Sequence, residues 1–176
     1  STDPRAMDRD ATFYRATVGE VAHLPALQER HETGVCVVGG GFAGLNTALG
    51  LCERGVRDVT VLEAERIGHG ASGRNGGFVF SGFSRGEADL LRDLGPQRAR
   101  ALHAGTVAAV DLIRARCRRH GIDCDLVDQG VIWANWFRDD DVLERRRRLL
   151  EMHFDTHWQP VDRARLRQQL KSERYS

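Results

Sequence analysis

The feature that most constrains the fold of this chain is a glycine-rich turn between an apolar run and a helical pattern. The run Val35–Val38 is rich in valine and bounded by glycines, which predicts a strand buried on both faces of a parallel sheet. Gly39, Gly41 and Gly44 then follow the pattern G-x-G-x-x-G. In that pattern the first glycine permits a tight turn, and the second lets backbone amides approach a pyrophosphate. The third lets the helix pack close to the strand.

The residues that follow supply the context that this pattern needs. A helix is predicted after the turn, with its N-terminus directed at the phosphates and a left-handed end at Gly55. A second buried strand, Val59–Leu62, ends on Glu63, an acid placed about 20 residues after the glycines to accept hydrogen bonds from ribose hydroxyls. This order favours a dinucleotide-binding unit over a glycine turn between two core elements. The apolar face of the helix is predicted from Leu45, Ala48, Leu49 and Cys52.

The segment after Glu63 bears on which dinucleotide is bound. An ordinary NAD domain would continue with another helix and a third parallel strand, and no such strand is predicted here. Instead, residues 66–77 are dense in glycine and carry Ser72, Arg74 and Asn75. Glycines suit a backbone with unusual dihedrals or one that lies close to a large planar ligand. A flexible surface loop is the alternative that composition leaves open.

Three runs of residues together carry a family resemblance. They are Val37-Val38-Gly39-Gly40-Gly41-Phe42-Ala43-Gly44-Leu45, Val61-Leu62-Glu63-Ala64, and Arg66-Ile67-Gly68-His69-Gly70-Ala71-Ser72-Gly73-Arg74-Asn75-Gly76-Gly77. With these runs the chain resembles the FAD-dependent amine and D-amino-acid oxidase superfamily, and within it most the gamma-glutamylputrescine oxidase-like branch. The resemblance extends from about Phe13 to the end, although only the first half carries specific motifs.

The resemblance implies an α/β fold with a Rossmann-like FAD-binding βαβ unit of the glutathione-reductase type, and FAD as cofactor. It places ADP at the glycine loop, Glu63 on the adenosine ribose, and residues 70–77 around the pyrophosphate and the edge of the isoalloxazine. In such enzymes the flavin takes a hydride equivalent from the carbon that bears a small-molecule amine; the imine is hydrolysed and oxygen is reduced to hydrogen peroxide. The expected cofactor-binding residues are Gly39, Gly41, Phe42, Ala43, Gly44, Glu63, Ala64, Arg66, Gly70, Ala71, Ser72, Arg74, Asn75, Gly76 and Gly77.

The remainder of the chain suggests three regions: an arm over 1–34, the FAD-binding unit over 35–95, and over 96–176 a helical segment that begins an α+β substrate domain. A helix is predicted over Pro96–His120, ending at Gly121. Asp125–Val127 and Val131–Ala134 read as a hairpin, followed by a helix after Asp139–Asp141 and a last helix from about Asp162. The expected apolar face of the long helix comprises Ala99, Leu102, Thr106, Ala109, Ile113 and Cys117, and that of the next helix Leu143, Leu150 and Phe154.

Composition excludes several classes of function. The run Arg145–Arg148 invites a nucleic-acid hypothesis, but acidic residues surround it and the net charge is only +1, so a solvated helix face is expected and no nucleic-acid partner. The first 34 residues hold no apolar run typical of an export signal or membrane span, which predicts a cytoplasmic protein without a membrane partner. The 4 cysteines, at 36, 52, 117 and 124, form no Cys-x-x-Cys pair and are expected to be reduced, with Cys36 and Cys52 buried and no metal bound.

Catalytic residues are not evident. His69 lies in the glycine-rich segment, where a solvent-facing or ribose-side position is favoured over a covalent link to FAD. His103, His120, His153 and His157 are expected to be surface residues. Trp133 and Trp136 could contact substrate or belong to the core. Strands expected of a complete two-domain oxidase are missing, so the chain is expected to be the N-terminal part of a longer enzyme that a further segment or another chain completes. An NAD-linked dehydrogenase module and a non-catalytic FAD-binding subunit of a split enzyme stay open as alternatives.

Overall fold

A computed structural model describes residues 12–19, 24–137, 139 and 141–175. The chain divides into two compact units, Ser1–Phe78 (unit 1) and Val79–Ser176 (unit 2), which are described separately. Much of the expected N-terminal arm, at 1–11 and 20–23, lies outside the described residues. Its described part contains a short helix, α1 (Phe13–Thr17), which begins where the Thr12 side chain accepts a hydrogen bond from the Arg15 amide at 3.1 Å.

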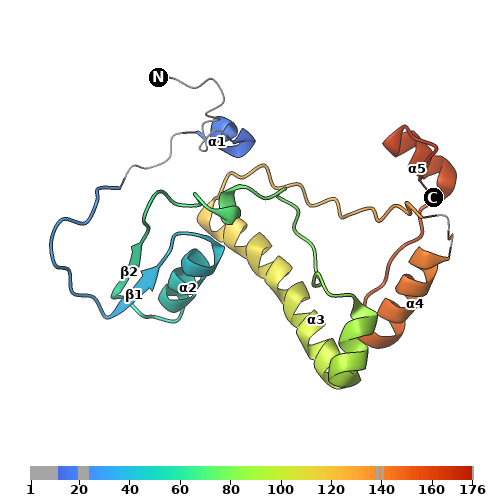
Figure 1. Cartoon of the computed structure of the whole chain (residues 1–176), viewed down its shortest axis with the longest axis horizontal. Helices are drawn as coiled ribbons and strands as arrows, with labels where there is room; N and C mark the ends of the chain where they lie inside the picture. The colour runs from blue at the N-terminus through green and yellow to red at the C-terminus, as the bar shows by residue number, and fades with distance from the viewer. Residues whose placement is uncertain (1–11, 20–23, 138, 140, 176) are drawn as a thin grey trace, which may run out of the picture. The chain divides into compact units, whose positions relative to one another are not determined.

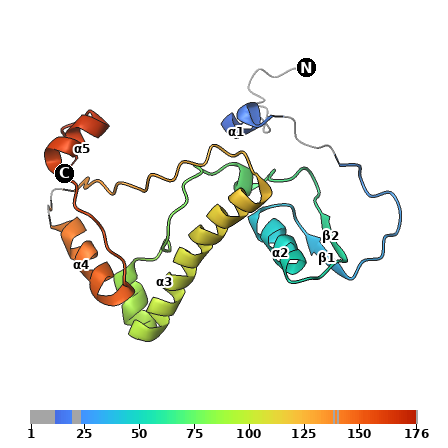
Figure 2. The ribbon, with the colours of Figure 1, turned by 180° about the vertical axis from the view of Figure 1, so that it is seen from behind.

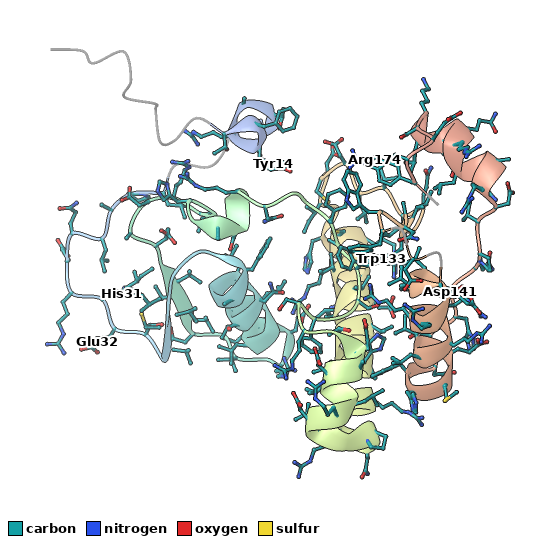
Figure 3. All side chains as sticks on the ribbon, turned by 45° about the vertical axis from the view of Figure 1, so that its right-hand side comes forward. Tyr14, His31, Glu32, Trp133, Asp141 and Arg174 are labelled. Atoms are coloured by element: carbon teal, nitrogen blue, oxygen red, sulfur yellow. The ribbon has the colours of Figure 1, made fainter. Side chains whose placement is uncertain are left out.

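Unit 1 is built on a parallel pair of strands joined by a helix. Strand β1 (Val35–Val38) pairs with β2 (Val59–Leu62) from Val35↔Val59 to Val38↔Leu62, and α2 (Phe42–Glu53) contacts both strands (Figure 1). Both predicted strands and the connecting helix are therefore confirmed. Thr60 of β2 also meets His31 of the segment before β1, at 3.4 Å between Oγ1 and Nε2 (Figure 3 labels His31).

Burial in unit 1 is less than the sequence predicts. Val37 is buried, but Val38 is 83% exposed, and Cys36 and Cys52 are also exposed. Successive residues of a strand point to opposite faces, and α2 covers only the face that carries Val37. The predictions of a strand buried on both faces and of two buried cysteines are therefore wrong for this chain. On the helix, Ala48 and Leu49 are half-buried while Leu45 is 39% exposed.

Unit 2 is dominated by a long kinked helix, α3 (Glu87–His120). The backbone leaves helical geometry at Gly95 (φ 74°, ψ 164°), just before Pro96, and the helix ends at Gly121 in the left-handed conformation (φ 60°). The predicted helix over Pro96–His120 is confirmed, and a helical segment from Glu87 precedes it that the sequence analysis did not predict. The change of helix direction falls at the glycine–proline pair, as expected for residues that interrupt helical hydrogen bonding.

Two further helices follow, both predicted. Helix α4 (Val142–Phe154) lies beside the Glu87 end of α3 in both views (Figures 1 and 2), and α5 (Arg163–Leu170) begins where Asp162 Oδ1 accepts the Arg165 amide at 2.9 Å. Asp140, part of the acidic start predicted for α4, lies outside the described residues. The core between α3 and α4 contains Leu90, Ala99, Leu150 and Phe154, with Leu91, Leu149 and Trp158 packed against it.

Two expectations for unit 2 are corrected. On α3 the buried side includes His103 rather than Leu102 or Ile113, which are 45% and 39% exposed. The hairpin predicted over Asp125–Val127 and Val131–Ala134 is absent: β1 and β2 are the only strands among the described residues. Asp125 (φ 51°) and Gly130 (φ 81°) have left-handed backbones, and these segments have no ladder partner to make them strands. None of the described helices has both the length and the hydropathy needed to cross a membrane.

Candidate nucleotide-binding site

The turn after β1 explains the spacing of its glycines. Gly39 has φ +104°, which side chains rarely permit, and its N–H donates to the Leu62 carbonyl of β2 at 2.7 Å. A Cβ on Gly44 would lie 1.9 Å from the carbonyl oxygen of Gly39. The first turn of α2 therefore presses directly on the loop that precedes it, and only hydrogen can occupy the Gly44 side-chain position.

The beginning of α2 is capped from a distant part of the chain. Gly41 is the N-cap residue and provides no side-chain hydrogen bond, while the Phe42 N–H donates to Ser72 Oγ at 2.9 Å. Ser72 belongs to the short 3₁₀ helix η1 (Ala71–Gly73). A Cβ on Gly41 would come within 2.9 Å of the same hydroxyl oxygen. The structure thus brings the glycine loop and the second glycine-rich segment together, 30 positions apart in sequence.

The second glycine-rich segment is held by its own hydrogen bonds. Arg74 Nε donates to the His69 carbonyl at 2.9 Å, Asn75 Nδ2 donates to the Ser72 carbonyl at 2.7 Å, and the Gly77 N–H donates to Asn75 Oδ1 at 2.9 Å. Of its predicted site residues, Gly70, Ala71, Arg74, Asn75, Gly76 and Gly77 are exposed and Ser72 is half-buried. This network argues against a purely flexible surface loop.

Glu63 lies where β2 ends, next to the glycine loop. Its carboxylate accepts the Gly40 N–H at 2.6 Å and the Glu65 N–H at 3.1 Å. The hydrogen bonds from Gly40 and then Glu65 lower the pKa of Glu63 below its ordinary value. An ionised carboxylate is an acceptor only, and its two oxygens retain lone pairs for further donors. Glu63 is therefore oriented to accept further hydrogen bonds from hydroxyl groups.

Other predicted residues flank this carboxylate. Ala64 is exposed and Arg66 is half-buried, with its backbone carbonyl accepting the His69 N–H at 3.0 Å. Gly40, which stands between the first two glycines of the pattern and was not among the predicted site residues, is buried, and its carbonyl accepts the Gly68 N–H at 3.0 Å. A Cβ there would lie 2.6 Å from Ile67 Cδ1. The run of three consecutive glycines, Gly39 to Gly41, is the sequence signal from which this constraint could have been predicted.

The site fits a dinucleotide. Leu45 donates the first intrahelical bond of α2 to Gly41, at 3.0 Å, so the amides of Ala43 and Gly44 precede the hydrogen-bonded helix and point out of its end. Backbone amides at a helix N-terminus, with no side chain on Gly41 or Gly44 to obstruct them, suit a pyrophosphate. Among the described residues no group of His, Cys, Asp and Glu could hold a metal ion.

Unit 2 contains an aromatic cluster around Arg146. The rings of Trp133 (labelled in Figure 3) and Trp158 stack at 5.8 Å between centroids, and the Arg146 guanidinium lies 4.5 Å and 5.1 Å from them. Arg146 also donates to Glu87 at 2.8 Å and 3.1 Å. A cavity of about 880 Å³ opens beside this cluster, with Phe80, Val131 and Leu166 among its lining residues. Arg146 is therefore not on a solvated face, in contrast to the exposed Arg145 and Arg148.

Arg145 and Arg148 are exposed, as predicted for a solvated helix face, whereas the side chain of Arg147 is half-buried. Arg147 pairs with Glu144 and Glu151 at 2.7 Å and 2.9 Å, Arg148 pairs with Glu144 at 2.7 Å, and Arg145 pairs with Asp139. His103, expected at the surface, is instead 3% exposed and packs on the Phe154 ring at 4.9 Å between centroids. Phe154 of α4 covers His103 of α3. The charged residues near His103 in the sequence gave no indication of this burial.

A parallel βαβ unit with a glycine turn, a helix N-terminus above it and an acid at the end of the second strand defines a Rossmann-like nucleotide-binding protein. The family model of FAD-dependent oxidoreductases (DAO) matches residues 34–175. This chain belongs to that family, whose cofactor is FAD.

Relatives with curated descriptions agree with this assignment. The chain is 36% identical to gamma-glutamylputrescine oxidoreductase of Escherichia coli (strain K12) over 169 residues, which are 96% of this chain and 39% of the relative. It is 33% identical to "Probable oxidoreductase OrdL" of Haemophilus influenzae over 168 residues, 93% of this chain and 38% of that protein. The chain thus spans less than half the length of these relatives. No solved structure matches it.

Proposed function

We propose that this chain is the FAD-binding part of an oxidoreductase that oxidises an amine at its nitrogen-bearing carbon, with gamma-glutamylputrescine or an amino acid as the class of substrate. The relative whose name carries this substrate is 36% identical to the chain. The observation that supports flavin binding most directly is the contact of Ser72 with the first turn of α2, at 2.9 Å, because it unites both glycine-rich segments in one site.

In this proposal different residues of unit 1 bind different parts of the dinucleotide. The amides at the start of α2, in the loop that runs from Gly39 to Gly44, hold the pyrophosphate, and Glu63 accepts the ribose hydroxyls. Ser72 already accepts the Phe42 N–H, so its own O–H is left to donate to a phosphate oxygen. The remaining members of the proposed site are Ala64, Arg66, Gly70, Ala71, Arg74, Asn75, Gly76 and Gly77.

Bound FAD supplies the hydride acceptor for the amine-bearing carbon. The proposed products are an imine, which water converts to an aldehyde or keto acid, and hydrogen peroxide from the reoxidation by oxygen. The role of the chain is to orient the nucleotide through fixed backbone amides and one ionised carboxylate. These groups are pre-positioned, since Glu63 and Ser72 are already bonded to the loop that they serve.

The finer architecture belongs to the same proposal. We assign the βαβ unit to the glutathione-reductase type, residues 35–95 to the FAD-binding domain and 96–176 to the beginning of the substrate domain. A further segment or a second chain would supply the rest of the fold, and the cytoplasm is the proposed location. The coverage of 39% of the Escherichia coli relative is consistent with a larger enzyme.

Titration with FAD tests the proposal. The chain is titrated while flavin fluorescence and the visible spectrum are recorded, with NADH as the competing cofactor. Ser72→Ala is expected to weaken FAD binding about tenfold, the effect of one lost hydrogen bond, whereas the exposed Ser84→Ala is the matched control. Glu63→Gln is compared in the same way with Glu65→Gln. Flavin that remains with acid-precipitated protein would instead favour the alternative of a covalent link, with His69 as the first candidate.

The alternatives give different results in the same experiment. Binding of NADH in place of FAD would replace the proposal with a dehydrogenase module. FAD binding without reduction by gamma-glutamylputrescine or other amines under anaerobic conditions, even in the full-length enzyme, would favour a non-catalytic flavin-binding subunit. A folded chain that binds neither nucleotide would show that the further segment or second chain is needed to complete the site.

A further inference from the structure

The end of α3 brings two cysteines together. Cys117 lies in the last turn of the helix and Cys124 follows the Gly121 cap, so the two are seven positions apart in sequence, and their Sγ atoms are 3.8 Å apart. Both are free thiols. Cys124 is exposed and Cys117 is half-buried, so solvent reaches the pair. The two cysteines lack Cys-x-x-Cys spacing in the sequence, and the helix cap is what places them in contact.

The approach of the two thiols is fixed from several sides. The Gly121 N–H and the Ile122 N–H donate back to the carbonyls of Arg118 and Cys117, at 3.4 Å and 3.0 Å. Arg114 donates to Asp128 at 2.7 Å and to Asp111 at 2.8 Å, which ties the segment after Cys124 to the helix. The geometry of the pair therefore follows from the helix cap and an ion-paired return, and it does not depend on the two thiols themselves.

We propose that Cys117 and Cys124 are a peroxide-reactive dithiol that closes to an intramolecular disulfide. This inference goes beyond the proposed function and does not depend on it, because the oxidant can be supplied as hydrogen peroxide.

The reaction balances with peroxide as the only oxidant. The Cys117 thiolate attacks one peroxide oxygen, the O–O bond breaks, and the departing hydroxide takes a proton to leave as water. The resulting sulfenic acid is then attacked by the Cys124 sulfur, which forms the S–S bond and releases a second water. In sum, two thiols lose two hydrogen atoms and two electrons, and one peroxide is reduced to two waters.

The roles of the two sulfurs follow from their surroundings. Partial desolvation of its sulfur, and then the hydrogen bond with Cys117, raise the pKa of the Cys124 thiol, so Cys124 is the poorer source of a thiolate. We therefore assign the first attack on peroxide to Cys117 and the second step to Cys124, whose sulfur lies 3.8 Å away. Arg118 and Arg119 follow it directly in the sequence and add positive charge near this helix end.

The test is a thiol titration of the whole chain before and after treatment with hydrogen peroxide. Free thiols, measured under denaturing conditions, are expected to fall from 4 to 2, with the pair recovered by dithiothreitol and a disulfide-linked peptide joining Cys117 to Cys124. The exposed Cys36 and Cys52 provide the matched control: Cys36→Ser with Cys52→Ser should leave the peroxide-dependent loss intact. In that background Cys124→Ser should trap Cys117 as a sulfenic acid, detectable with dimedone.

Several outcomes would overturn the proposal. It fails if both thiols remain titratable after peroxide treatment, if Cys36 and Cys52 account for the loss, or if the linked peptides come only from intermolecular dimers. A sulfenic acid trapped on Cys124 in the Cys117→Ser variant, with none on Cys117 in the Cys124→Ser variant, would contradict the assigned order of attack. The far-ultraviolet circular dichroism of each variant is recorded in parallel, and a Cys117→Ala variant replaces any serine variant that loses helix.

Discussion

Unit 1 fixes its turns with backbone amides and short side chains, whereas unit 2 fixes its helices with arginine–carboxylate pairs and aromatic rings. In unit 1 the decisive contacts are made by the glycine loop. A methyl group at Gly44 would collide with Gly39, and Glu63 and Ser72 each accept a hydrogen bond from a backbone amide. In unit 2 the decisive contacts are those of Glu87 and Arg146, between the stacked tryptophans and α3.

The difference teaches where each unit tolerates change. A backbone that touches backbone has no flexible group to yield, because close-packed atoms cannot move apart without shifting whole elements. Long side chains in unit 2 can rotate or be replaced together. We therefore expect the largest effects of substitution in the glycine loop, intermediate effects at the half-buried ion pair, and the smallest on the solvated face of α4.

The Gly44→Ala substitution should give the largest effect. Its Cβ would lie 1.9 Å from the Gly39 carbonyl oxygen, so the loop or α2 must shift, and we expect a loss of about 3 kcal/mol in the free energy of unfolding, together with loss of FAD binding. Urea denaturation and flavin titration measure the two effects. Gly105→Ala in α3 is the control, because nothing lies within 4 Å of its Cβ and alanine should add about 1 kcal/mol of helix stability. Equal effects at both glycines would remove the contrast between the units.

The Glu87→Gln substitution should give an intermediate effect. The side chain of Glu87 is 9% exposed and that of Arg146 is 33% exposed, so the neutral variant leaves a half-buried cation without its counter-charge. We expect a loss of about 2 kcal/mol in the free energy of unfolding, measured by urea denaturation. The double variant Glu87→Leu with Arg146→Met should recover most of this loss, since an apolar pair needs no compensation. A double variant no more stable than the single one would show that the ion pair itself is required.

The smallest effect is expected at Glu144, whose influence should appear only in acid. Hydrogen bonds from Arg147 and then Arg148 lower the pKa of Glu144 from 4.5 to about 2. Its contribution to stability is therefore complete above pH 4.5 and is lost as the pH falls toward 2. Glu144→Gln should be less stable than the wild type at pH 6 and should match it near pH 2, as measured by thermal unfolding.

The control for Glu144 is Glu29→Gln, which changes an exposed carboxylate outside unit 2. We expect it to leave the acid dependence of unit 2 unaltered. Molar salt should shrink the Glu144 effect, because exposed charges are screened over about 3 Å at that ionic strength. A Glu144 effect that is indifferent to both pH and salt would mean that the side chain acts through packing.

The sequence by itself determined the parts of this protein whose physics is local. Glycine spacing, valine runs and one terminal acid predicted β1, α2, β2 and the position of Glu63, since turn geometry and strand propensity depend on neighbouring residues. The ends of α3 and α5 followed in the same way from Gly121 and Asp162. The family resemblance rested on the same local motifs, and it named FAD before any geometry was known.

Only the tertiary structure decided which distant residues meet. The bond between Ser72 and Phe42, the pair of Glu87 with Arg146, the burial of His103 and the contact of Cys117 with Cys124 depend on how elements pack or on how a helix ends. The predictions of a hairpin near Asp125–Ala134 and of a buried Val38 were wrong for the same reason. A strand needs a partner, and a side chain is buried only where another element covers it.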